Sequence, residues 1–224
     1  MKAADVMVRG VVTVHPETDV VDAIKLLAER DISALPVVDA SGELVGIIGE
    51  ADLLHRVEIG TERHRPWLQE SLTAATTLAA EFAKSHGKKV SEVMTKGVVS
   101  ATEDTPLAEI ATLFERQRIK RVPIVRDGKL VGVVSRSNLI QALASAATTG
   151  EGREDSDRRI RDAVLDRLEQ QHWTDFGERN VTVNDGVVHL WGLISSDSER
   201  QALTALAEGV PGVSAVRDEM FAIY

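Results

Sequence analysis

The stretch from residue 31 to residue 38 reads Asp-Ile-Ser-Ala-Leu-Pro-Val-Val, and residues 118–125 read Arg-Ile-Lys-Arg-Val-Pro-Ile-Val. The similarity continues toward the N-terminus, because residues 6–13 (Val-Met-Val-Arg-Gly-Val-Val-Thr) recur as residues 93–100 (Val-Met-Thr-Lys-Gly-Val-Val-Ser). Both pairs are separated by the same offset, 87 residues. An internal repeat of this kind indicates two copies of one supersecondary unit.

A second match follows the proline of each copy. Residues 42–48 match residues 128–134 one residue out of register, which a length change in a turn allows. β-branched residues flank the Gly-containing turn, so each copy predicts a two-stranded hairpin. Apolar residues at helical spacing before the proline predict an amphipathic helix, and a last helix should begin near Glu50 and near Arg136. Each copy therefore reads strand, helix, strand, strand, helix.

Taken as a whole, this duplicated pattern resembles the CBS-domain family. The resemblance covers residues 1–54, the first repeat, and residues 90–145, the second repeat. It implies an α/β (α+β) module in which the two repeats associate and leave clefts for an adenosine-type ligand, AMP, ADP, ATP or S-adenosylmethionine. It also implies a disc-like homodimer. For Pro36 and Pro123 themselves, packing in the core is the expected role.

In that family, the ligand chemistry lies where the second hairpin strand turns into the last helix, with a Ser or Thr followed three residues later by an Asp. A carboxylate can accept hydrogen bonds from both hydroxyls of a ribose, whereas a hydroxyl beside a helix start suits phosphate. The first repeat has Gly49 and Asp52 at these positions, and the second has Ser135 and Asn138. The resemblance therefore implies unequal clefts, with Asp52 the stronger ribose acceptor because an amide offers one accepting oxygen.

Basic residues concentrate in the second repeat. Residues 93–140 carry eight Lys and Arg against five Asp and Glu, whereas residues 1–54 carry four against ten. Lys120 and Arg121 stand before the proline at positions from which family members reach phosphates, and Arg136 stands at a helix start.

We therefore predict one nucleotide with its ribose on the first repeat and its phosphates toward the second. The candidate ligand residues are Ser33, Gly49, Asp52, Lys120, Arg121, Ser135, Arg136 and Asn138. The alternative is that Asp52 only caps a helix and that the basic residues are solvated surface charges.

Composition argues against several other functions. The chain has 224 residues, no cysteine and a formal net charge of -9. A reducing, cytoplasmic setting is expected, and no cysteine nucleophile or cysteine zinc site is available. The six histidines show no spacing typical of a metal site, and no catalytic residues are predicted. The negative charge disfavours nucleic acid, and no stretch reaches the roughly 18 to 20 apolar residues of a membrane span.

Residues 55–89 are predicted to be a helical insert between the repeats. Pro66 suits a first helical turn, and an amphipathic stripe follows it. The stripe consists of Trp67, Leu68, Leu72, Ala75, Ala79 and Phe82. Two packings remain open, over its own module or against a partner subunit.

The rest of the chain shows a different order of elements. Residues 146–156 are polar and contain Gly, which predicts a linker. Residues 157–224 read helix, strand, strand, helix, strand, and Asn-Asp-Gly at residues 184–186 indicates a hairpin turn. With Val-Pro-Gly-Val at residues 210–213, this part resembles the BON family, which implies a small αββαβ domain usually associated with envelope or phospholipid-proximal proteins. From residue 151 onward fifteen acids face eight arginines, so protein or ligand contact is expected in place of lipid binding.

The sequence thus predicts a regulatory module that is not an enzyme. A CBS pair senses an adenosine nucleotide, and a BON-like domain transmits or localises the signal to an unidentified protein partner. Two alternatives remain: a scaffold with empty clefts that works by assembly, and a membrane adaptor led by the BON-like part. The sequence does not distinguish among the four ligands.

Overall fold

The computed structural model describes residues 1–61, 74–148, 154–174 and 180–222. The chain divides into two compact units. Unit 1 comprises residues 1–11, 100–126 and 131–224, and unit 2 comprises residues 12–99 and 127–130.

Unit 2 is built around the first hairpin. Its elements are α1 (Val20–Arg30), β1 (Ala34–Val38), β2 (Leu44–Gly49), α2 (Glu50–Leu53), a 3-10 turn (Val57–Ile59), α4 (Ala75–His86) and α5 (Val90–Val93). Strands β1 and β2 are antiparallel, with Leu35 opposite Ile48. Both residues are fully buried and pack with the apolar face of α1, as its helical spacing predicts.

Unit 1 contains the second hairpin and the C-terminal domain. The elements around the hairpin are a 3-10 turn, η1 (Ala3–Asp5), α6 (Leu107–Arg116), β3 (Arg121–Arg126), β4 (Lys129–Ser135) and α7 (Arg136–Thr148). Ile110 and Phe114 of α6 pack against Val122 and Ile124 of β3 in one buried cluster. The predicted helix and hairpin of each repeat are thus confirmed.

The C-terminal domain has the predicted αββαβ order. Its elements are α8 (Glu154–Glu169), β5 (Asn180–Asn184), β6 (Val187–Ile194), α9 (Asp197–Glu208) and β7 (Ala215–Ala222). The sheet order is β5-β6-β7, antiparallel and then parallel. Asp185 and Gly186 both have positive φ, 49° and 74°, as the predicted Asn-Asp-Gly turn requires. The last strand, β7, begins at Ala215.

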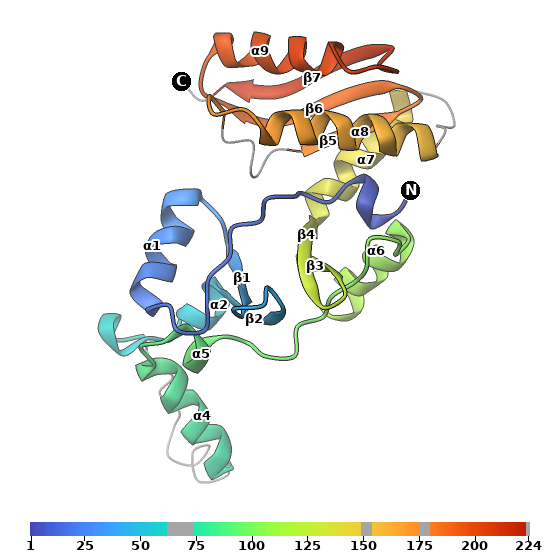
Figure 1. Cartoon of the computed structure of the whole chain (residues 1–224). Coiled ribbons are helices and arrows are strands. Elements are labelled where there is room, and N and C mark those ends of the chain that lie inside the picture. Colours follow the sequence, from blue (N-terminus) through green and yellow to red (C-terminus); the bar gives the residue numbers. More distant parts are fainter. Residues whose placement is uncertain (62–73, 149–153, 175–179, 223–224) are drawn as a thin grey trace. The chain divides into compact units, whose positions relative to one another are not determined.

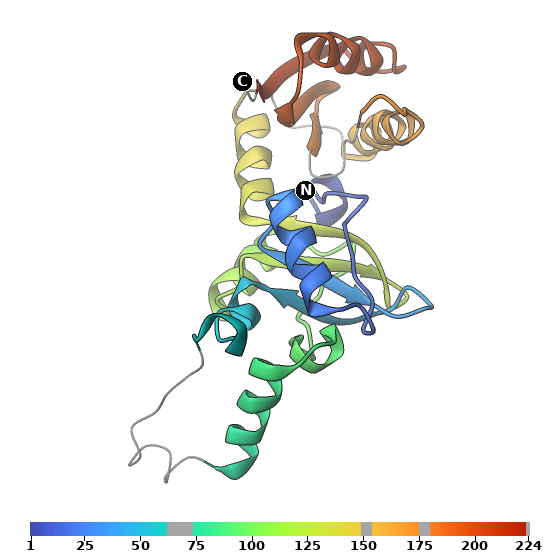
Figure 2. The same ribbon diagram turned by 90° about the vertical axis from the view of Figure 1, so that its left-hand side faces the viewer.

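The two faces of this sheet have different neighbours. Val181 and Val183 of β5 belong to the core formed with α8 and α9. Thr182 lies between them in the strand and so faces the opposite side. There its hydroxyl is 2.6 Å from that of Ser145 on α7. Figure 2 shows α7 and α8 on either side of the sheet.

Each unit also includes the first residues of the other repeat. In unit 1, Val8 pairs with Val133 of β4 through backbone hydrogen bonds of 2.9 and 3.0 Å. In unit 2, Thr95 pairs with Ile47 of β2 in the same way, at 2.8 and 3.0 Å. A Cβ at Gly132 would lie 2.9 Å from the Val8 carbonyl oxygen, so the close approach of the segment requires glycine there.

The first strand predicted for each repeat is reduced to a single parallel bridge, Val14 to Val37 and Ala101 to Ile124. The reason is the proline of each hairpin. In a parallel ladder the next hydrogen bond would be donated by the backbone N–H of Pro36 or Pro123, and proline has none.

The segments predicted as a linker and as a helical insert are described in part. Of the linker predicted at 146–156, residues 146–148 belong to the end of α7 and residues 154–156 to the start of α8. Residues 144, 146 and 147 are alanines, which have the highest helix propensity, and they extend α7. In the insert, Phe82 is 63% exposed and stacks on His86. Pro66, Trp67, Leu68 and Leu72 lie outside the described residues.

In the described part of the chain, no helix is long and apolar enough to cross a bilayer.

Candidate nucleotide-binding site

The first predicted turn lies at the end of β2. The backbone N–H of Gly49 donates to Asp52 Oδ2 at 3.2 Å, and the N–H of Glu50 donates to the Ser33 carbonyl at 3.1 Å. These bonds satisfy N–H groups at the start of α2 that have no partner within the helix. The structure thus brings Ser33, Gly49 and Asp52 together, and Asp52 caps the helix.

The other carboxylate oxygen of Asp52 accepts two side-chain hydrogen bonds. Lys84 Nζ lies 2.9 Å from Oδ1, and Thr95 Oγ1 lies 2.8 Å from it. The Asp52 side chain is only 12% exposed, whereas that of Lys84 is 42% exposed. Sequence reasoning missed both partners, because Lys84 comes from the insert and Thr95 from the start of the second repeat.

Gly49 stands where the family pattern has a hydroxyl residue, and the structure gives a steric reason. A Cβ at Gly49 would lie 2.8 Å from the Ser33 carbonyl oxygen and 3.0 Å from the Cβ of Ala34. Real Cβ atoms do not approach a backbone oxygen so closely, and the rigid β1 strand cannot move away cheaply. Glycine is therefore required by the close contact of β1 with this turn.

The second predicted turn is held by a reciprocal cap. Asn138 Oδ1 accepts hydrogen bonds from the Ser135 N–H at 2.7 Å and from Ser135 Oγ at 2.9 Å. The Asn138 N–H lies 3.4 Å from Ser135 Oγ. Asn138 is 4% exposed, and both lone pairs of its oxygen are engaged. The serine and asparagine therefore fix the start of α7.

The basic residues next to this turn fall into two groups. Arg136 donates to the Ile119 carbonyl at 3.2 Å, and its guanidinium lies 6.0 Å from the centre of the Phe114 ring. Lys120 is exposed and Arg121 is half-buried. Within the described residues, neither of these two side chains forms an ion pair or a side-chain hydrogen bond. The backbone joins them to the turn, because the Arg136 N–H donates to the Lys120 carbonyl at 3.3 Å.

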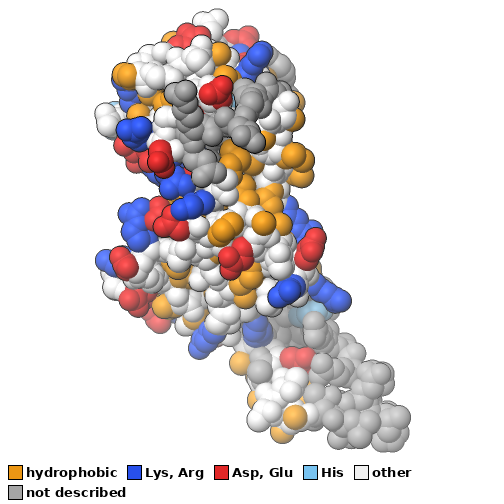
Figure 3. Space-filling view, turned by 90° about the vertical axis from the view of Figure 1, so that its right-hand side faces the viewer, with side chains coloured by type: hydrophobic (Ala, Val, Ile, Leu, Met, Phe, Trp, Pro, Cys, Tyr) orange, Lys and Arg blue, Asp and Glu red, His pale blue; other side chains and the backbone are white. Residues whose placement is uncertain are grey.

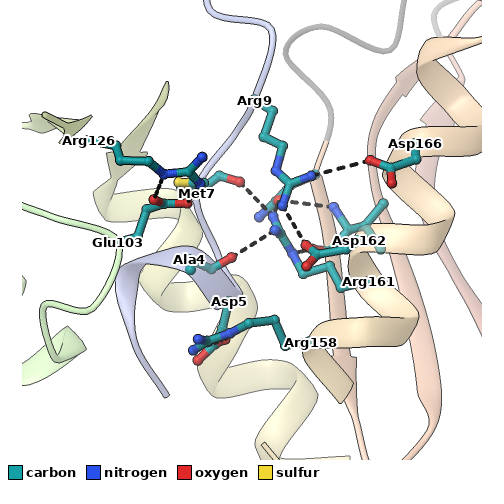
Figure 4. Close-up of polar contacts among 12 residues, drawn as sticks. Ala4, Asp5, Met7, Arg9, Glu103, Arg126, Arg158, Arg161, Asp162 and Asp166 are labelled. Atoms are coloured by element: carbon teal, nitrogen blue, oxygen red, sulfur yellow. Dashed lines mark hydrogen bonds and ion pairs between the residues drawn. The ribbon is translucent and has the colours of Figure 1, made fainter. Parts of the chain in front are cut away.

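Unit 1 also contains a buried arginine that sequence reasoning did not single out. Arg161 of α8 is 1% exposed and donates to the carbonyl oxygens of Ala4, Met7 and Val181 at 2.8, 2.6 and 2.7 Å. Figure 4 shows its side chain reaching the N-terminal segment. Desolvation lowers the pKa of Arg161 to about 10, so the guanidinium remains charged at neutral pH.

Ion pairs surround this arginine. Arg158 binds Asp5 at 2.8 Å, and Arg9 binds Asp162 and, at 3.7 Å, Asp166 (Figure 4). The N-terminal segment is thus attached to α8 by one buried and several partly exposed charges. The helical spacing of α8 revealed its apolar face only, because a sequence does not show which backbone carbonyls a distant arginine meets.

Among the described residues, no group of three or more His, Asp or Glu side chains is placed to hold a metal ion.

Comparison with known proteins covers both parts of the chain. The CBS domain model matches residues 3–59 and 90–145, together about half of the chain, and the BON domain model matches residues 156–221. An uncharacterized protein of Methanocaldococcus jannaschii is 34% identical over 154 residues, 64% of this chain and 91% of that protein.

Two further comparisons involve a chloroplastic CBS domain-containing protein of Arabidopsis thaliana, CBSX2. It is 32% identical over 135 residues, which cover 58% of this chain and 57% of CBSX2. The crystal structure of CBSX2 in complex with AMP has a TM-score of 0.57 at 29% identity, covering 65% of this chain and 97% of that chain. The mixed helix and strand content and these neighbours confirm the predicted α+β class. The chain belongs to the CBS domain family, as a tandem CBS pair followed by a BON domain.

Proposed function

We propose that the CBS pair binds an adenosine-type nucleotide and that the chain is a regulatory protein without catalytic activity of its own. The observation that carries this proposal is the carboxylate of Asp52. It is nearly buried at a strand-to-helix turn, and two of its hydrogen bonds come from side chains that a ribose hydroxyl could replace as donors. The AMP complex of CBSX2 supports adenosine as the ligand class.

In this proposal, different residues bind the ribose and the phosphates of the ligand. Asp52 accepts from the ribose, beside the turn formed by Ser33 and Gly49. Lys120 and Arg121 serve the phosphates, because their charges are not used by other described side chains and suit anionic oxygens. Ser135, Arg136 and Asn138 complete the set by holding the second turn. The ligand is AMP, ADP, ATP or S-adenosylmethionine, and the proposal includes the reducing cytoplasm, which suits a cysteine-free chain.

The phosphate role of Lys120 is testable by comparing two ligands. In Lys120→Ala, AMP affinity should fall about tenfold, because a charge-assisted hydrogen bond is worth roughly 1.5 kcal/mol. Adenosine affinity should not change, since adenosine has no phosphate. Lys25→Ala is the control, because Lys25 is an exposed lysine paired with Asp22 on α1. Isothermal titration calorimetry gives both affinities, and equal losses for AMP and adenosine would contradict the assignment.

We further propose that two copies of the chain form a homodimer through the CBS helices. Hydrophobic side chains reach the surface on the face drawn in Figure 3. On α7, Ile140 and Leu143 are 65% and 67% exposed, and their spacing of three residues puts them on one side of the helix. Apolar helix surface of this kind is typical of a covered interface.

Light scattering tests the dimer. At micromolar concentration the mass should correspond to two chains of 24.3 kDa. Leu143→Glu should shift the mass toward one chain, because a buried carboxylate without a partner opposes association. Glu169→Ala, on the exposed end of α8, should leave it unchanged. A monomeric mass for the unaltered protein would sink the dimer and leave nucleotide binding to be judged separately.

One observation favours a second candidate function, a scaffold with empty clefts. Asp52 and the Asn138 oxygen accept hydrogen bonds from groups of the chain itself. A saturated turn is stable by itself, so the chain could work by assembly alone. Binding of an adenosine ligand to the full chain distinguishes the two functions, because only the nucleotide sensor requires it.

A further inference from the structure

Gln141 of α7 lies between the second nucleotide turn and the BON domain. Its Oε1 accepts a hydrogen bond from Asn138 Nδ2 at 3.1 Å and another from Asn180 Nδ2 at 2.9 Å. Asn138 belongs to the turn, and Asn180 is the first residue of β5. One side-chain oxygen thus joins the turn to the BON sheet.

The hydrogen bonds that connect Asn138, Gln141 and Asn180 have fixed directions, because their neighbours are backbone groups that can only donate or only accept. The Ser135 N–H requires the oxygen of Asn138 on its side, so the amide nitrogen faces Gln141. The Val181 N–H donates to Asn180 Oδ1, which fixes the position of that oxygen. Asn180 Nδ2 in turn donates to the Val6 carbonyl at 3.0 Å. Gln141 must therefore present its oxygen to both asparagines.

This geometry explains why position 138 departs from the acidic residue of the family pattern. An aspartate could accept from Ser135 as the asparagine does, but an ionised carboxylate has no hydrogen to donate to Gln141. The asparagine satisfies both neighbours. Its amide also carries a second hydrogen, which has no acceptor within the described residues.

Two further contacts connect the same elements. The hydroxyls of Ser145 and Thr182 are 2.6 Å apart, and both residues are fully buried. Arg161 donates to Asn180 Oδ1 at 3.2 Å while it holds the N-terminal segment, whose Val8 pairs with β4. The BON domain therefore contacts both elements that meet at the second turn, β4 through the segment and α7 directly.

We propose that Gln141 couples the nucleotide turn of the second repeat to the docking of the BON domain. A ligand oxygen that accepts from Asn138 fixes the orientation of its amide, which keeps the hydrogen bond to Gln141 in place and so holds Asn180. Nucleotide binding and BON docking are then linked, and each stabilises the other. The inference rests on the proposed function, because it assigns a regulatory output to the same turn.

Amide hydrogen exchange of the full chain tests this coupling. Saturating AMP should slow exchange of residues 180–184 about fivefold, the lower end of couplings between protein sites. In Gln141→Ala the slowing at residues 180–184 should disappear. AMP should still slow exchange at residues 129–135 of β4 in this variant, because β4 leads directly into the turn. Gln201→Ala, an exposed glutamine of α9, is the matched control and should behave as the unaltered protein. Equal slowing of β5 in Gln141→Ala would overturn the proposal.

A second comparison without nucleotide separates this inference from the proposed function. Asn138→Ala should speed amide exchange of residues 180–184. In a Gln141→Ala background the same substitution should not speed that exchange further, because the hydrogen bonds through Gln141 are already lost. If AMP does not bind but this pattern is found, the proposed function fails and the coupling stands. If Asn138→Ala leaves β5 exchange unchanged, the coupling is wrong whether or not AMP binds.

Discussion

Replacing Arg161 by alanine is expected to lower the free energy of unfolding by about 3 kcal/mol or more. The guanidinium is 1% exposed and donates to three backbone carbonyls from two distant parts of the chain, Ala4, Met7 and Val181. Its removal leaves those oxygens buried without donors, and each unsatisfied group costs about 1–3 kcal/mol. Loss of the unfavourable burial of the charge offsets part of this cost.

Denaturant unfolding followed by circular dichroism measures the change. Arg159→Ala, an exposed arginine of the same helix, is the control and should cost less than about 0.5 kcal/mol. Arg161→Lys should be intermediate, because a lysine keeps the charge but cannot reproduce the fork of guanidinium donors. A cost of Arg161→Ala equal to that of Arg159→Ala would show that the hydrogen bonds of Arg161 do not stabilise the attachment of the N-terminal segment to α8.

The second large effect is expected at Asp52. Asp52→Ala should weaken AMP binding about ten- to hundredfold, because a pair of charge-assisted hydrogen bonds to the ribose contributes roughly 1.5 to 3 kcal/mol. Asp52→Asn should weaken binding less, since the amide oxygen can still accept one hydroxyl. The asparagine also keeps an acceptor for the Gly49 N–H, so the start of α2 should remain capped.

Binding and stability must be measured on the same variants, because Asp52 also pairs with Lys84 and Thr95. Titration calorimetry gives the affinity and thermal unfolding gives the stability. Asp22→Ala, which removes an exposed carboxylate of α1, should change neither. If Asp52→Asn and Asp52→Ala both bind AMP as the unaltered protein does, Asp52 is only a helix cap.

The local features of the fold were predictable because each depends on neighbouring residues. The repeat of residues 31–38 at 118–125 located both hairpins, and the Asn-Asp-Gly turn located the hairpin of the BON domain. The two strand-to-helix turns also follow from local sequence. Gly49 and Asn138 were recognised as departures from the family pattern, but the contacts that require them involve residues elsewhere in the fold.

The unpredicted features depend on contacts between distant segments. Lys84 meets Asp52 across 32 residues, and Arg161 meets the carbonyl of Met7 across 154. Neither helical periodicity nor helix propensity predicts such contacts, because Lys84 and Arg161 resemble ordinary surface charges within their own helices. The pairing of Val8 with the other repeat is hidden for the same reason, since either hairpin offers an equivalent strand.

The most direct test of nucleotide sensing is a calorimetric titration of the full chain with AMP, ADP, ATP and S-adenosylmethionine. We expect saturable binding of at least one of them, with an affinity that Asp52→Ala reduces about ten- to hundredfold. Absence of binding by all four ligands, with a protein that unfolds cooperatively, would contradict the nucleotide site and favour the scaffold.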